Sequence, residues 1–64
     1  MRKKSMDMDW DEVPVVVDID FVQWLLGISR ETVRLDIHSG RLPAFRIGGI
    51  WRINKSDLIA YASE

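Results

Sequence analysis

Four residues in the middle of the chain have side chains and a spacing suited to reading DNA bases. Glu31, Arg34, Leu35 and His38 occupy positions i, i+3, i+4 and i+7, which share one face of an α-helix. Arginine can donate to O6 and N7 of guanine in the major groove, and glutamate can accept from N4 of cytosine. The spacing therefore indicates a helix that presents Glu31, Arg34 and His38 to a partner.

The charge of the chain is unevenly distributed around these residues. The net charge is -1, yet residues 1–20 carry three basic and six acidic residues. Residues 30–55 carry only two acidic residues against six basic ones, namely Arg30, Arg34, Arg41, Arg46, Arg52 and Lys55. A basic block within an acidic chain indicates an anionic partner, although a solvated surface is the simpler alternative.

Two predicted helices must position this face. The first is expected over residues 19–26 and the second over residues 30–39, with Asp18 and Ser29 as their N-caps and a glycine after each. Only residues 27–29 separate the two helices. This short glycine-containing connection is typical of a helix-turn-helix unit.

A β-hairpin and a last helix are predicted next. The β-rich runs 45–47 and 50–53 flank Gly48 and Gly49, and two glycines suit a type I′ turn, which needs positive φ at both positions. Asn54 is predicted to cap the last helix. A hairpin that follows a helix-turn-helix is a wing.

The predicted fold is therefore α+β, mostly helical: a small winged helix-turn-helix with a wing and a C-terminal helix. Residues 1–12 are expected to form a flexible charged arm, and residues 13–64 a single domain. The helical periodicity predicts a core made of Ile19, Val22, Leu25, Leu26, Val33, Ile37, Leu58, Ile59 and Tyr61.

The predicted site is a surface for double-stranded DNA. Backbone amides near Ser29 and Arg30 can hold a phosphate, and Arg46 and Arg52 beside Trp51 can grip the backbone or the minor groove. The predicted major-groove residues are Arg30, Glu31, Thr32, Arg34, Leu35 and His38. The predicted backbone and wing residues are Ser29, Arg41, Arg46, Gly48, Gly49 and Arg52.

From Leu25 to Tyr61 the chain resembles the excisionase and MerR-like winged helix-turn-helix group. The resembling strings are LLGISRETVR, SGRLPAFRIGG and WRINKSDL, and ETVR resembles the start of the groove helix in lambda-type excisionases. Those proteins are recombination directionality factors: they bend phage attachment DNA and turn a tyrosine integrase from integration to excision. The resemblance implies base reading at Glu31, Leu35 and His38, with wing contacts from the hairpin.

The chain departs from this family at three positions. The family usually has arginine where this chain has Leu35 and His38, and often a large apolar or aromatic residue where it has Asp36. Leu35 has two interpretations: contact with a thymine methyl, or packing against a neighbouring protomer or the N-terminal arm. His38 is either a groove or phosphate contact or a solvated side chain.

Phe21 and Trp24 make the first predicted helix unusually apolar. They are either covered by residues 13–17 folding back over them, or exposed as a patch for another copy or for the integrase. Assembly of several copies along DNA is what the resemblance implies.

The predicted function is that of a DNA-binding and DNA-bending excisionase in the cytoplasm of a bacterial host, associated with the nucleoid when bound. The alternatives are a small MerR-like regulator or antitoxin with the same fold, and a pure protein-interaction module. The chain has no cysteine and shows no nucleophile–base pair or ligand cluster. No enzyme activity, catalytic residue, metal, cofactor or membrane association is therefore expected.

Overall fold

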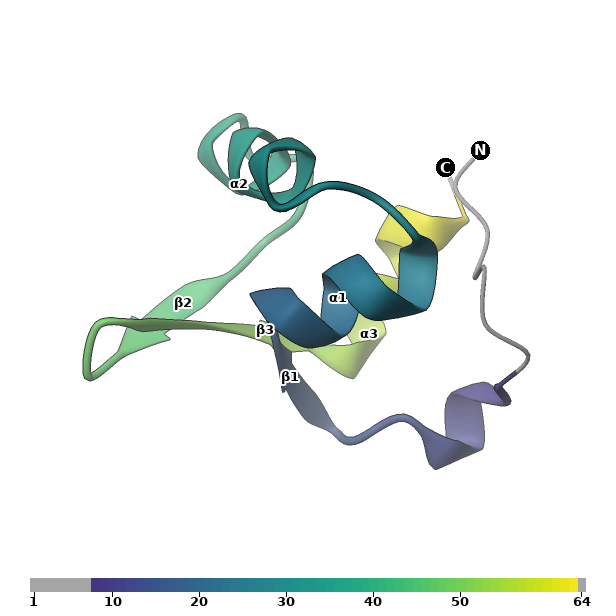
Figure 1. The fold of residues 1–64 in the computed structure, drawn as a ribbon. Helices are drawn as coiled ribbons and strands as arrows, with labels where there is room; N and C mark the ends of the chain where they lie inside the picture. Colours follow the sequence, from purple (N-terminus) through teal and green to yellow (C-terminus); the bar gives the residue numbers. More distant parts are fainter. Residues whose placement is uncertain (1–7, 64) are drawn as a thin grey trace.

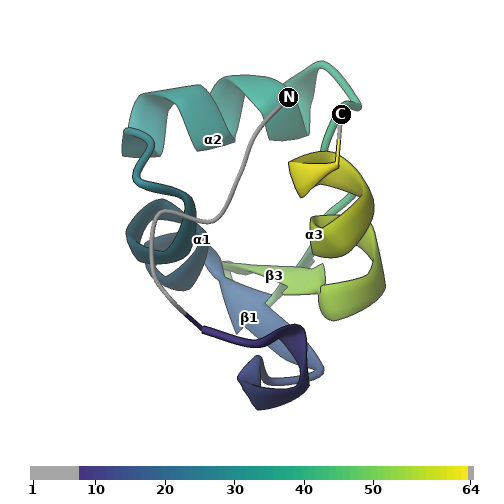
Figure 2. The ribbon, with the colours of Figure 1, turned by 90° about the vertical axis from the view of Figure 1, so that its right-hand side faces the viewer.

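A computed structural model describes residues 8–63, which fold into helices packed on a small β-sheet (Figures 1 and 2). Three α-helices and a three-stranded antiparallel sheet confirm the predicted fold class. In chain order the elements are η1 (Trp10–Glu12), β1 (Val16–Asp18), α1 (Ile19–Leu26), α2 (Arg30–His38), β2 (Phe45–Ile47), β3 (Ile50–Asn54) and α3 (Lys55–Ala62). The hairpin β2–β3 projects away from the helices beneath α2 (Figure 1).

Local hydrogen bonds explain the helix-turn-helix. A side-chain oxygen of Asp18 accepts from the backbone N–H of Phe21 at 2.8 Å, which begins α1. Gly27 ends α1 in the left-handed conformation with φ of 66°. Ser29 Oγ then accepts from the backbone N–H of Thr32 at 3.1 Å and begins α2. The predicted turn is confirmed.

Two predicted helix ends differ from the structure. α2 ends at His38, one residue earlier than expected. Asn54 occupies the N-cap position of α3, but its side chain makes no capping hydrogen bond, so the prediction that it caps the helix is wrong. The adjacent backbone N–H of Lys55 donates instead to the carbonyl of Val15 at 2.7 Å, which joins the start of α3 to the segment before β1.

The hairpin forms as predicted. Gly48 and Gly49 have φ of 59° and 81°, the positive values that a type I′ turn requires. Ile47 and Ile50 are the cross-strand pair next to this turn. The predicted wing is therefore present.

The strand β1 was not among the predicted elements. It pairs with β3 in the register Val16↔Asn54 and Val17↔Ile53, giving the sheet order β1-β3-β2. The interpretation that residues 13–17 cover Phe21 and Trp24 is therefore wrong for Trp24: Val16 and Val17 join the sheet, and Trp24 stays 49% exposed.

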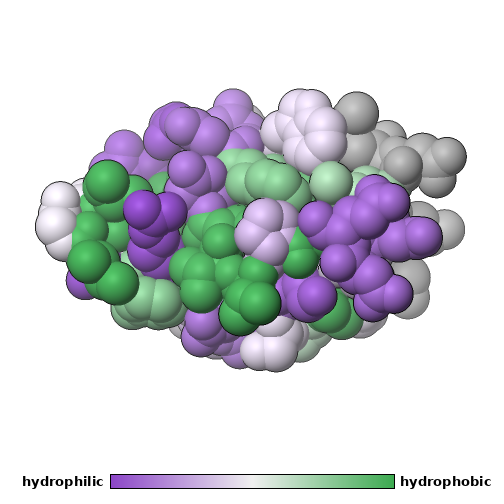
Figure 3. Space-filling model, turned by 90° about the horizontal axis from the view of Figure 1, so that it is seen from below, coloured by the Kyte–Doolittle hydropathy of each residue, from purple (hydrophilic) through white to green (hydrophobic). Residues whose placement is uncertain are grey.

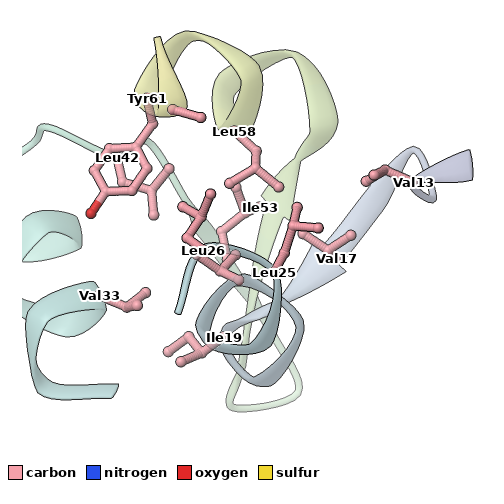
Figure 4. Close-up of a cluster of buried hydrophobic side chains, with 12 residues drawn as sticks. Val13, Val17, Ile19, Leu25, Leu26, Val33, Leu42, Ile53, Leu58 and Tyr61 are labelled. Atoms are coloured by element: carbon pink, nitrogen blue, oxygen red, sulfur yellow. The ribbon is translucent and has the colours of Figure 1, made fainter. Parts of the chain in front are cut away.

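The core lies between the sheet and the three helices (Figure 4). Most predicted core residues are buried, while Ile37 and Ile59 are only half-buried. The core also contains Leu42, Ile53 and Ala62, together with Val13 and Val17 from the segment before α1. That segment therefore contributes to the core as well as to the sheet.

The residues before β1 also pack on this core. Met8 and Trp10 are half-buried against it, and Lys55 Nζ donates to the carbonyl of Trp10 at 3.1 Å. The part of the predicted arm from Met8 onward is thus in contact with the domain, while residues 1–7 lie outside the described residues.

One buried polar contact fixes α2 against α3. Asp36 is only 8% exposed, and the hydroxyl of Tyr61 donates to its carboxylate Oδ2. The ring of Tyr61 lies in the core, with its oxygen directed toward α2 (Figure 4). The buried side of α2, opposite the predicted site, is therefore joined to α3 by a hydrogen bond within the core.

Candidate DNA-binding surface

The outer face of α2 brings the predicted base-reading residues together. Glu31, Arg34, Leu35 and His38 are all exposed and, with Arg30, line a shallow hollow of about 420 Å³. Leu35 is 62% exposed, so within residues 8–63 it does not pack into the fold. An apolar side chain at the centre of a polar helix face is suited to a partner group such as a thymine methyl.

The first turn of α2 is rigidly capped. Ser29 Oγ and Thr32 Oγ1 lie 2.9 Å apart and share a hydrogen bond, while Ser29 Oγ also accepts the backbone N–H of Thr32. Both hydroxyls are thus engaged within the protein. Their direct role is to shape the start of α2, and contacts to DNA from these two residues stay a prediction.

A cluster of three side chains connects α2 to the wing. His38 meets the ring of Trp51 edge-on, with ring centroids 6.2 Å apart. The Arg46 guanidinium lies over the same indole at 5.2 Å from its centroid, a cation–π geometry. His38 therefore contacts the wing as well as facing outward, and Trp51 lies between a side chain of α2 and a side chain of β2.

A second concavity separates α2 from the wing. It measures about 300 Å³, and its lining is Asp18, Ile19, Asp20, Arg30, Arg34, Arg46, Gly49, Ile50 and Trp51. We call this concavity the notch. Arg30 and Arg34 line both the notch and the hollow on α2. The outer face of α2 and the wing therefore form one continuous surface that meets at the notch, where three arginines outnumber two aspartates.

Arg52 and Arg41 lie apart from this junction. In the hairpin register Arg46 is opposite Trp51, whereas Arg52 is opposite Phe45. Opposed residues share a face of the sheet and neighbours alternate, so Arg46 and Arg52 are on opposite faces. Arg41 is exposed after α2 and lines neither concavity. Contacts of Arg41 and Arg52 with DNA stay predictions.

The open face of the sheet carries exposed apolar residues. Ile47 and Ile50 are 61% and 51% exposed near the wing tip. Seen from below, hydrophobic surface lies at the wing and beneath the middle of the molecule, with hydrophilic residues between (Figure 3). The wing tip thus combines apolar side chains with the glycine turn.

Phe21 and Trp24 form an aromatic pair on α1. Their ring centroids lie 5.6 Å apart at an interplanar angle of 57°. Phe21 is half-buried against the core, while Trp24 is 49% exposed. Of the two residues, Trp24 is therefore the one that a partner can reach.

The sequence reasoning missed one charged residue of this surface. The Asp20 carboxylate forms an ion pair with the Arg30 guanidinium across the helix-turn-helix. The sequence offered no local signal for this pair, because its two residues lie ten positions apart on different helices. Among residues 8–63, no three His, Cys, Asp or Glu side chains gather as metal ligands would.

Comparison with known families identifies the class of this fold. A family model described as a helix-turn-helix domain matches residues 18–64. The chain therefore belongs to the helix-turn-helix domain family, whose members bind DNA. Comparisons with curated proteins and with solved structures give no significant match.

None of the helices in the described part of the chain is long and apolar enough to cross a membrane.

Proposed function

We propose that this protein is an excisionase: it binds and bends attachment-site DNA, assembles there with other copies of itself, and directs a tyrosine integrase toward excision. In this proposal α2 enters the major groove and the wing follows the adjacent backbone. The protein acts without catalysis or a cofactor, as an architectural partner of the integrase.

One observation carries the DNA-contacting part of the proposal. Arg34 lies where the outer face of α2 meets the notch beside the wing. A helix in the major groove and a hairpin on the backbone require a continuous surface of this kind. The family match supports DNA as the ligand.

The excisionase assignment is supported by the resemblance of three strings in the sequence. Those strings extend over the end of α1 and the start of α2, then over the loop to the hairpin with β2 and its turn, and finally over most of β3 and the start of α3. They therefore contribute both parts of the proposed DNA-contacting surface. A small transcriptional regulator with the same fold is the alternative, because the same surface serves both.

An excision assay separates these two functions. Purified integrase from the same genome is incubated with its attachment-site DNA, with and without this protein. Excision that depends on this protein is the expected result. Unchanged excision, together with specific binding at a promoter, would instead make the protein a regulator.

Glu31 is expected to read one base pair. Replacing it with alanine should relax the preference at a single position by about 1–3 kcal/mol while other positions keep theirs. Glu12→Ala is the matched control, because Glu12 is an exposed glutamate in η1. Binding measured on a set of single-base variants of the site tests this. Uniform weakening at all positions would show that Glu31 does not read a base.

Trp24 is the proposed contact to another copy or to the integrase. Trp24→Ser should leave binding to a single site within about twofold and reduce cooperativity between adjacent sites by about fivefold, the effect of losing one buried aromatic anchor. Val15→Ser is the control, because Val15 is 75% exposed and apolar but lies outside the aromatic pair. Cooperativity that is equal in both variants contradicts the assignment.

A further inference from the structure

The notch between α2 and the wing is lined by three arginines and two aspartates. These charged side chains differ in whether each already has a partner within the protein. Asp18 is committed to capping α1, where it accepts from the backbone N–H of Phe21. Asp20 is committed to Arg30 through the ion pair. Of the three notch arginines, Arg34 and Arg46 have no carboxylate partner among the described residues.

The Asp20–Arg30 pair lies at the edge of the DNA-facing surface. Asp20 is in the first turn of α1 and Arg30 is the first residue of α2, where backbone amides and a basic side chain favour a phosphate. The side chains are 72% and 50% exposed, respectively. An exposed pair of this kind contributes little to folding and exchanges readily with another anion.

We propose that Asp20 limits the affinity of the DNA-binding surface by holding the Arg30 guanidinium in an intramolecular ion pair. Arg30 then reaches a DNA phosphate only when this pair opens, so Asp20 competes with the phosphate for the same cation. This inference rests on the proposed binding of DNA and assigns to Asp20 the role of a residue that sets affinity.

The proposal predicts a gain of binding from the removal of an acid. With Asp20→Asn, Arg30 is free to make one more phosphate contact. Binding should tighten by about threefold to fivefold, the effect of one exposed charged contact. The slope of the logarithm of the DNA-binding constant against the logarithm of the salt concentration should steepen by about 0.9. Because phosphates carry no sequence information, the gain should be the same on any duplex.

The experiment is a double-mutant cycle measured by fluorescence anisotropy on labelled duplexes of two unrelated sequences, at several salt concentrations. The proteins are the wild type, Asp20→Asn, Arg30→Gln and the double variant. Asp11→Asn is the control for net charge. Asp11 is an exposed aspartate in η1, and the purple η1 segment lies on the side of the fold away from the β2–β3 hairpin (Figure 1). Thermal unfolding checks that each variant folds, and Asp20→Ser provides a second replacement at the same position.

The expected result is a gain with Asp20→Asn that exceeds the gain with Asp11→Asn and disappears when Arg30 is glutamine. A gain of equal size in the Arg30→Gln background would show that Asp20 acts only by repelling DNA, which overturns the proposal. Weaker binding by a folded Asp20 variant would show that the pair positions α2 for binding, which also overturns it. Failure of the wild type to bind any duplex at low salt would contradict the proposed function itself.

Discussion

Replacing Arg34 with alanine is expected to weaken binding to the preferred site by about tenfold to hundredfold. The reason is that a bidentate arginine–guanine pair contributes about 1–3 kcal/mol of discrimination. Arg30 and Arg34 both line the hollow on α2 and the notch, but Arg30 is held in an ion pair with Asp20, so Arg34 is the better placed of the two. Titration of labelled duplexes that carry the preferred site or a scrambled one measures the loss.

Arg34→Lys distinguishes base reading from simple charge attraction. Lysine keeps the positive charge but lacks the planar guanidinium group that donates to both O6 and N7 of guanine. We expect the lysine variant to keep the salt dependence of the wild type and to lose much of its preference for the site. Full preference in the lysine variant would place Arg34 on a phosphate instead. An alanine variant that binds as tightly as the wild type would contradict both roles.

Replacing Tyr61 with phenylalanine is expected to lower the free energy of unfolding by about 1–3 kcal/mol. The Asp36 carboxylate then stays buried but loses the phenol O–H that donates to it. Small domains have only about 5 kcal/mol of stability, so this is a large fraction. Each kcal/mol should lower the Tm by about 4–8 °C, which calorimetry or circular dichroism will measure.

Ser63→Ala is the matched control for the loss of a hydroxyl. Ser63 Oγ donates to the carbonyl of Ile59 at 2.8 Å, but this bond is exposed. Its removal is expected to change stability by less than about 0.5 kcal/mol. A Tyr61→Phe protein that is as stable as the Ser63→Ala protein would show that the buried bond does not hold α2 to α3.

The elements with local signals could be predicted from the sequence. The capping of α1 by Asp18 and of α2 by Ser29 depends on residues three positions away, and the hairpin depends on the consecutive Gly48 and Gly49. These structures are set by backbone conformation and hydrogen bonds within a few residues. Sequence patterns therefore report them directly.

The features that were missed depend on partners far along the chain. β1 is only three residues long and exists because Val16 pairs with Asn54. The burial of Asp36 on α2 has no local signal either, because the Tyr61 hydroxyl that donates to its carboxylate lies 25 positions later. A polar residue can be buried only where such a partner exists, and the partner is visible only in the fold.

The candidate site also combines features that local sequence patterns predict with features that depend on tertiary packing. The outward face of α2 follows from helical periodicity, so the exposure of Glu31, Arg34 and Leu35 could be expected. The contacts of His38 and Arg46 with Trp51 could not be predicted, because they depend on the angle at which the hairpin leaves the domain. That angle is set by tertiary packing and not by the spacing of residues.

The central claim is that the outer face of α2 and the wing bind DNA together. The most direct measurement follows the backbone amide signals of the ¹⁵N-labelled protein by NMR while a short duplex is added. We expect the largest changes in residues 29–38 and 45–52, with small changes in η1 and α3. Changes concentrated in η1 and α3, with the α2 and hairpin signals unmoved, would contradict it.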